Sequence, residues 1–245
     1  MMANQSFLAS LNPAIKLLAH FFVMFLLMAI SDPMVTFLVW VLSVLIGMIL
    51  GGWRMIYLLK RLLPYIGFFV LTFWMMAAFG EGDDRIWQWG WFYMTVESMN
   101  HGLTIALRML GFVTYGLLFT STTDITLFIM SLIHQCKLPP KWAYGLLVGF
   151  RFIPLFKSEL NQMKIAHRVR GYKQTNRWKA FMRYALPLFT QGIRKSERIA
   201  IAMEARGFTG TRDRTYYQTT KIVLKDWMYL FSLLLIVLGI VIFVG

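Results

Sequence analysis

The chain has 245 residues, of which 58 % are apolar and only 15 % are charged, yet its formal net charge is +14. This composition excludes a disordered chain and an ordinary soluble enzyme, because soluble proteins average roughly 45–50 % apolar residues even with Gly counted. Its single Cys excludes a disulfide scaffold and a cysteine-based metal cage. An apolar chain with a large positive charge predicts an integral membrane protein that has a basic part.

Four apolar stretches in the first half of the chain have the character of membrane spans. They are residues 17–30, which their neighbours extend to Ala14, and residues 34–50, 62–79 and 102–120. A spanning helix needs about 20 mostly apolar residues. We therefore predict that residues 1–124 form a transmembrane domain.

The loops between these stretches predict their orientation. The first connection, residues 31–33, has no Lys or Arg, whereas the second carries Arg54, Lys60 and Arg61. The third, residues 80–101, carries four acidic residues against Arg85 alone. Because Lys and Arg are enriched in cytoplasmic loops, we expect the second connection inside the cell and the third outside. The segment after the fourth span is then expected in the cytoplasm.

The segment after the fourth span carries the net positive charge of the chain. Residues 121–225 hold 19 of the 25 Lys and Arg but only 5 of the 11 Asp and Glu. Within it, the apolar stretch 142–156 is short and interrupted by Arg151, so its depth stays open. We predict a basic cytoplasmic domain over residues 125–225 and a last span within residues 226–245. The expected fold is all-α: a polytopic membrane protein with about five transmembrane helices and two or three long amphipathic cytoplasmic helices.

The basic segment has the same opening and the same ending twice. Arg170-Gly171 begins sixteen residues after Pro154, and Arg206-Gly207 begins nineteen residues after Pro187. Pro suits the first position of a helix and Gly the position just beyond its end. The pattern predicts two helices of about 16–20 residues, each beginning at its proline. A repeated arginine end favours paired docking over simple capping, because a guanidinium can bind a carboxylate through two hydrogen bonds.

Catalytic chemistry has little support in the sequence. There is no P-loop pattern, and the four His are scattered without metal-ligand spacing, so we expect no catalytic residues, no metal site and no cofactor. One alternative is a membrane-embedded enzyme acting on lipid or isoprenoid phosphates, for which Asp83-Asp84 is the only adjacent acidic pair. A membrane-anchored nucleic-acid binder is disfavoured, since the basic segment has apolar helical stripes and no recognisable binding module.

Several segments resemble the transmembrane (T) component of energy-coupling factor (ECF) transporters, the EcfT/CbiQ family. The resemblance covers nearly the whole chain and lies in residues 11–17, 102–108, 120–124, 146–154, 167–171 and 204–208. The family signature is a pair of Ala-Arg-Gly motifs that end two long cytoplasmic coupling helices. Here the second motif is intact, Ala205-Arg206-Gly207, and the first reads Val169-Arg170-Gly171, which keeps the Arg and the Gly.

The resemblance implies a non-catalytic coupling subunit of an ECF-type ABC importer in a bacterial or archaeal cell membrane. The implied partners are two ABC-type ATPase subunits, alike or different, a small substrate-binding membrane subunit and the lipid bilayer, with no nucleic acid. Arg170 and Arg206 would each bind acidic residues in a groove of one ATPase subunit and pass ATP-driven motion to the substrate-binding subunit. The implied cargo is a vitamin or a cobalt or nickel ion. Other basic residues are expected to contact anionic lipid head groups or to speed association: Lys164, Arg168, Arg194, Lys195 and Arg198.

Overall fold

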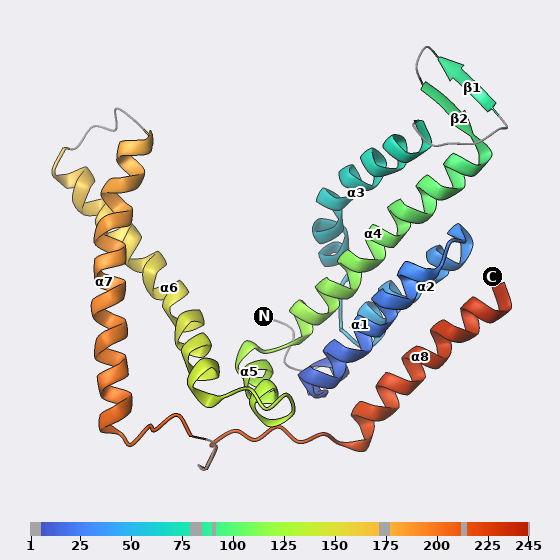
Figure 1. Ribbon diagram of the computed structural model, residues 1–245. Coiled ribbons are helices and arrows are strands. Elements are labelled where there is room, and N and C mark those ends of the chain that lie inside the picture. The colour runs from blue at the N-terminus through green and yellow to red at the C-terminus, as the bar shows by residue number, and fades with distance from the viewer. Residues whose placement is uncertain (1–5, 79–84, 90–91, 172–176, 212–214, 245) are drawn as a thin grey trace. The chain divides into compact units, whose positions relative to one another are not determined.

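The computed structural model, shown in Figure 1, describes residues 6–78, 85–89, 92–171, 177–211 and 215–244. These residues form a short 3-10 helix (Phe7–Ser10) and the α-helices α1 (Pro13–Ala29), α2 (Pro33–Ile49), α3 (Met55–Ala78), α4 (Val96–Thr122), α5 (Ile125–His134), α6 (Pro140–Val169), α7 (Arg177–Ala205) and α8 (Leu224–Val244). An antiparallel hairpin of β1 (Arg85–Trp89) and β2 (Phe92–Thr95) lies between α3 and α4. The all-α membrane fold predicted from the sequence is confirmed, and the hairpin is a small addition to it.

The predicted spans fall on α1, α2, α3, α4 and α8. Among the described residues, α3, α4 and α8 are long and apolar enough to cross a membrane, whereas α1 and α2 are apolar helices of 17 residues each. A helix of that length covers about 25 Å, which is less than the roughly 30 Å of a hydrocarbon core. The number of five spans therefore stays a prediction.

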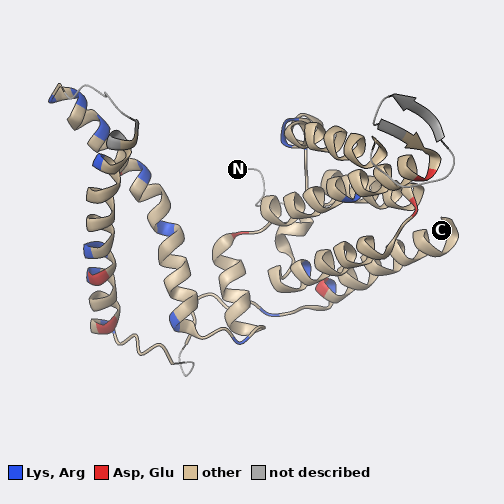
Figure 2. Cartoon of the chain, turned by 45° about the horizontal axis from the view of Figure 1, so that its top comes forward, with Lys and Arg blue, Asp and Glu red and all other residues tan. Residues whose placement is uncertain are grey.

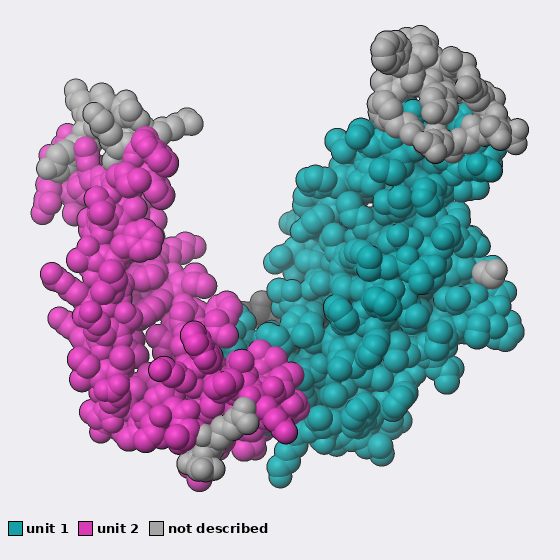
Figure 3. Space-filling view, in the orientation of Figure 1, with its two compact units in different colours: residues 1–131, 220–245 teal, residues 132–219 magenta. Residues whose placement is uncertain are grey.

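The chain forms two compact units, coloured separately in Figure 3. Unit 1 contains residues 1–131 and 220–245, and unit 2 contains residues 132–219. Unit 2 holds 17 of the 25 Lys and Arg but 4 of the 11 Asp and Glu. Figure 2 shows these basic residues spaced along α6 and α7. The positive charge is thus concentrated on one structural unit.

The helix at the centre of unit 1 is α4. It packs against α1, α2 and α3, while α8 packs against α1 and α2. The backbones of α3 and α4 approach closely at Gly102, where an added Cβ would lie 3.1 Å from the carbonyl oxygen of Phe73. Small residues at helix contacts are typical of membrane proteins, where close van der Waals packing replaces the hydrophobic driving force.

Polar side chains of α4 also hold the turn between α1 and α2. The guanidinium of Arg108 donates a hydrogen bond of 2.7 Å to the carbonyl oxygen of Ile30, just after α1 ends. The hydroxyl of Thr104 donates to the next carbonyl, that of Ser31, at 3.1 Å. The one charge well inside the fourth predicted span thus satisfies backbone groups at a helix end, which otherwise lack partners.

Unit 2 is built on the antiparallel pair of α6 and α7. An added Cβ at Gly192 of α7 would lie 3.0 Å from the ring of Phe156 of α6, so the aromatic ring fills the space that the glycine leaves. One turn further along, Lys195 of α7 forms an ion pair with Glu159 of α6. These contacts fix the register of the two helices.

Two ring contacts extend this register to both ends of the pair. His167 and Tyr184 have ring centroids 5.3 Å apart near the α6–α7 connection. Tyr144, in the first turns of α6, and Phe208, just after α7, have centroids 5.4 Å apart. Each pair joins a residue of α6 to one at the matching antiparallel position, so contacts run from one end of the pair to the other.

The prediction that Pro154 and Pro187 begin helices is wrong, because both lie inside longer helices, α6 and α7. The helix-starting proline of α6 is Pro140, preceded by Pro139. Pro154 cannot donate to the carbonyl of Phe150, a loss that an interior proline always causes. The apolar stretch 142–156 and the first basic helix are consequently one helix of 30 residues.

Candidate functional site

The end of α7 has the geometry predicted for Arg206-Gly207. Gly207 adopts a left-handed conformation with φ of 79°. Its N–H donates to the carbonyl of Glu204 at 2.9 Å, and the N–H of Phe208 donates to the carbonyl of Met203, also at 2.9 Å. These two bonds form a Schellman motif, in which a glycine ends the helix and satisfies its last carbonyls. Arg206 is therefore held at the tip of a capped helix.

The end of α6 shares the left-handed glycine and one bond of this kind. Arg170 is the residue that follows α6, and its N–H donates to the carbonyl of Ala166 at 3.1 Å. Gly171 has φ of 70°, and its N–H donates to the carbonyl of Arg168 at 3.1 Å. Both helices thus present an arginine directly before a left-handed glycine.

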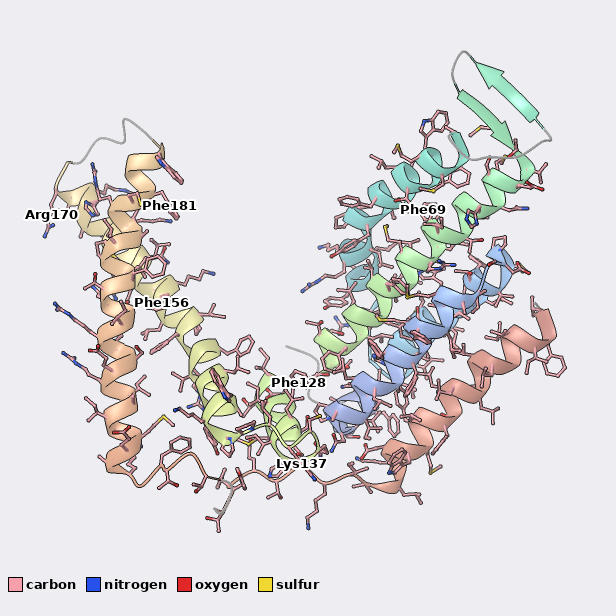
Figure 4. All side chains as sticks on the ribbon, viewed as in Figure 1. Phe69, Phe128, Lys137, Phe156, Arg170 and Phe181 are labelled. Carbon is pink, nitrogen blue, oxygen red and sulfur yellow. The ribbon has the colours of Figure 1, made fainter. Side chains whose placement is uncertain are left out.

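Both arginines are open to an external partner. The side chains of Arg170 and Arg206 are exposed, and Figure 4 shows Arg170 at the tip of α6. Lys195 and Glu159 form an ion pair, whereas neither Arg170 nor Arg206 is paired with a carboxylate of the described residues. Val169 is 82 % exposed.

The two arginines lie at opposite ends of the helix pair. Because α6 and α7 are antiparallel, Arg170 lies beside the α6–α7 connection, whereas Arg206 lies at the far end of α7. The 29 residues of α7 correspond to about 43 Å at 1.5 Å per residue. A partner that binds both arginines must therefore offer two separate sites.

The remaining basic residues divide into two groups. Lys164, Arg168, Arg194 and Arg198 are exposed. Lys195, which the sequence grouped with them, is instead paired with Glu159 between the two helices. Lys195 therefore joins α6 to α7, and the other four are the ones available to lipid head groups or to a partner.

Metal-dependent chemistry finds no ligand set in the described part of the chain. No group of three His, Cys, Asp or Glu there is placed to hold a metal ion. Asp83 and Asp84, the acidic pair required by the lipid-phosphate alternative, lie outside the described residues.

Comparison with known proteins decides the family. A family model described as "Cobalt transport protein", CbiQ, matches residues 4–217. The chain belongs to the CbiQ family. Proteins named energy-coupling factor transporter transmembrane protein EcfT are similar over most of its length. The one from Limosilactobacillus fermentum is 30 % identical over 87 % of this chain and 84 % of its own. The one from Staphylococcus aureus is 29 % identical over 98 % and 92 %.

These matches confirm the EcfT/CbiQ assignment made from the sequence. The protein is thus a membrane protein of the type that supplies the transmembrane component of ECF transporters. A third relative, EcfT of Lacticaseibacillus paracasei, is 26 % identical over 92 % of this chain and 89 % of its own. The CbiQ match includes both arginine motifs, since residues 169–171 and 205–207 fall inside it.

The sequence analysis missed two charged residues that the fold buries. Lys16 and Asp226 are each 1 % exposed, in unit 1. A charge next to an apolar stretch is ordinarily an interfacial residue, so neither stood out. The available signal was Asn12-Pro13 just before Lys16, a helix start that brings polar groups together at one end of the bundle.

Proposed function

We propose that this CbiQ-family chain is the non-catalytic coupling subunit of an ECF-type ABC importer. Residues 125–225 form its cytoplasmic coupling domain, and residues 1–124 and 226–245 form a membrane domain of five spans. The observation that carries the proposal is the pair of capped, exposed arginine ends, Arg170-Gly171 and Arg206-Gly207, at the two ends of the α6–α7 pair. Two separated docking points suit a pair of ATPase subunits.

Each arginine end is suited to a groove that contains carboxylates. The guanidinium of Arg170 or Arg206 can form two parallel hydrogen bonds to one carboxylate, which an ammonium cannot copy. The left-handed glycine ends the helix directly behind the arginine, so no following turn obstructs the groove. The Val169 and Ala205 side chains, both exposed, would line the contact.

The rigid helices would convert ATPase closure into motion in the membrane. A helix has a fixed rise per residue, so α7 cannot shorten when two docking sites approach each other. The α6–α7 pair must then tilt, or pivot where Phe156 packs on Gly192 and Glu159 pairs with Lys195. Either motion would displace a subunit that contacts the α6–α7 pair.

The exposed apolar side chains of unit 2 indicate a contact with another subunit or with lipid. Ile153 of α6 and Leu186, Phe189 and Ile193 of α7 are each at least 60 % exposed. Large apolar side chains exposed in this number typically mark a protein or membrane contact. We assign it to the substrate-binding membrane subunit and the bilayer. That subunit would select the cargo, a vitamin or a transition-metal ion.

The test is a tagged purification from the native membrane in mild detergent. Wild type is compared with Arg170→Glu, Arg206→Glu, the double variant, and Arg194→Glu as an exposed control on α7 with the same charge change. Wild type and Arg194→Glu should retain two ATPase chains and a small membrane protein. The double variant should lose the ATPases alone. A double variant that keeps its ATPases, or a wild type that purifies alone, would refute the coupling function.

The size of the effect follows from breaking a buried charge pair. Removing one partner of such a pair costs about 2–5 kcal/mol of binding. That free energy corresponds to a roughly 30- to 4,000-fold weaker dissociation constant. Each single variant should therefore lose measurable ATPase affinity. The loss at Arg194 should be small and sensitive to salt, since an exposed charge is screened.

The alternative of an enzyme acting on lipid or isoprenoid phosphates is not favoured. Such an enzyme needs clustered acidic residues to hold a metal at the membrane surface, and the described residues offer no such cluster. Release of phosphate from an isoprenoid diphosphate by the purified chain with Mg²⁺ would support the enzyme alternative.

A further inference from the structure

Two buried charges lie at the end of unit 1 where the chain leaves for unit 2 and returns from it. Lys16 is near the start of α1, and Asp226 is in the first turn of α8. Both are 1 % exposed. A buried charge is costly unless hydrogen bonds satisfy it, so the bonds of these two residues indicate which parts of the backbone they hold.

Lys16 holds the end of α4. Its ammonium donates to the backbone carbonyl of Thr122 at 3.0 Å and to the Thr122 hydroxyl at 3.1 Å. The third donor binds the carbonyl of Leu8 at 2.9 Å. Thr122 is the last residue of α4, where backbone carbonyls lack helical partners and a cation is favoured by the helix dipole. All three protons of the ammonium are thus used on backbone or hydroxyl oxygens.

Asp226 holds the segment that leads into α8. One carboxylate oxygen accepts the N–H of Asn12 at 2.8 Å, and the other accepts the N–H of Val223 at 2.7 Å. The side-chain amide of Asn12 also donates to the carbonyl of Lys221 at 3.3 Å. The Asn12 side-chain oxygen meanwhile caps α1 by accepting the N–H of Ala14. Asn12 and Asp226 together join the start of α1 to residues 221–226.

Both chain connections of unit 2 are therefore bonded to the same N-terminal segment. The outgoing connection continues from Thr122 into α5, which Asp124 caps by accepting the N–H of Thr126 at 2.7 Å. Phe119 of α4 and Phe128 of α5 also pack together, with ring centroids 5.3 Å apart. The returning connection is residues 220–223. Among the described residues, the segment 8–16 bonds to both connections, through Lys16 on one side and Asn12 on the other.

We propose that Asn12, Lys16, Thr122 and Asp226 form an N-terminal clamp of positioning residues that makes the transfer of motion from unit 2 to the membrane helices stiff. This inference rests on the proposed coupling function. When unit 2 is displaced, the least stable structure between it and the membrane helices deforms first. A frayed helix end is such a structure, because its local unfolding costs little free energy. The clamp closes both weak points, so the displacement reaches α1, α4 and α8 instead of being absorbed at the connections.

The clamp offers isosteric variants that remove single bonds. Lys16→Met removes all three donors at similar side-chain volume. Asp226→Asn keeps one of the two acceptor oxygens and places an amide N–H against one of the two backbone N–H groups that Asp226 binds. Thr122→Val removes one acceptor of Lys16, whereas Thr122→Ser keeps it and is the matched control. Lys60→Met removes an exposed lysine of unit 1 and controls for net charge.

The experiment is amide hydrogen exchange on the purified complex with its ATPase and substrate-binding subunits, with and without Mg·ATP. The N–H groups of Asn12 and Val223 are themselves clamp donors, so their exchange reports on it directly. In wild type, Thr122→Ser and Lys60→Met, ATP should change exchange in α6 and α7 and leave residues 8–16, 118–124 and 220–226 protected. In Lys16→Met and Asp226→Asn, ATP should speed exchange in those three segments at least tenfold, with ATPase subunits retained and ATP still hydrolysed. Thr122→Val should show a smaller effect of the same kind, at least threefold.

Three results would overturn the clamp. The first is the same ATP-dependent exchange in the variants as in wild type. The second is a loss of protection that is equal with and without ATP, which a merely structural role would give. The third concerns Thr122 and decides the matter if the Lys16→Met and Asp226→Asn complexes fail to assemble. It is a Thr122→Val complex with the same ATP-dependent exchange as the Thr122→Ser complex. Failure of the coupling function itself is recognised separately, because the wild-type chain would then retain no ATPase subunits.

Discussion

Replacing Gly207 by Ala tests whether the left-handed glycine sets the position of Arg206. Gly207 has φ of 79°, a conformation that costs an L-residue about 1–2 kcal/mol. Ala also restricts the unfolded chain, which returns about 0.4–1 kcal/mol. The net expectation is a loss of about 1 kcal/mol at this helix end. Nothing lies within 4 Å of an added Cβ there, so the cost is conformational and not steric.

The assay is amide exchange at the last turn of α7, together with the affinity for ATPase subunits. A loss of about 1 kcal/mol opens the Schellman bonds about fivefold more often. The exchange rates of the backbone N–H groups at positions 207 and 208 should therefore be about fivefold higher in the variant than in wild type. ATPase affinity should fall by a similar factor, because Arg206 is no longer held in one place.

The matched control is Gly149→Ala in α6. Gly149 lies inside a helix, and an added Cβ there also meets nothing within 4 Å. Ala in a helix interior is favoured over Gly by about 1 kcal/mol, so this variant should slow local exchange. If Gly207→Ala behaves like Gly149→Ala, the left-handed conformation is not what holds the end of α7, and our account of the arginine ends fails.

Two further predictions concern packing within each unit. Gly102→Val should force the α3 backbone away from α4 near Phe73 and cost about 1–3 kcal/mol, seen as a lower midpoint of thermal unfolding in detergent. Gly116→Val, on the same helix with nothing within 4 Å of the added Cβ, should be close to neutral; equal effects at the two sites would contradict the close approach. Lys195→Glu should weaken the α6–α7 contact by about 0.5–1 kcal/mol, and adding Glu159→Lys should restore most of it. A double-mutant cycle with no coupling energy at low salt would show that this ion pair does not join the helices.

The helix ends illustrate what local sequence can predict. Arg206-Gly207 and Arg170-Gly171 end their helices as expected, because a left-handed C-cap depends on one residue's freedom to adopt positive φ. The prolines were misread for a related reason. Pro154 favours a helix start locally, but Pro139-Pro140 supplies that start earlier, and the apolar stretch between them continues the helix across Pro154.

Pairings between distant residues were beyond the sequence. Lys195 looked like any other basic residue of α7 until the α6–α7 register placed Glu159 opposite it. Likewise, Lys16 and Asp226 are 210 positions apart in the sequence, and only the bundle brings the starts of α1 and α8 together. Register between helices depends on packing along their whole length, which no single motif encodes.

The residues alone predicted a basic, all-α membrane protein with two arginine-glycine helix ends and a resemblance to the EcfT/CbiQ family. The membrane character and the helix ends follow from composition, from apolar run length and from local backbone preferences, all of which act within a few turns of chain. The family follows from the resemblance of its motifs. Helix packing is needed to place Arg170 and Arg206 at opposite ends of one antiparallel pair and to bond one N-terminal segment to both connections of unit 2. These depend on which helices pack together and in which direction, because burial and hydrogen bonding are satisfied for the bundle as a whole and not for each helix alone.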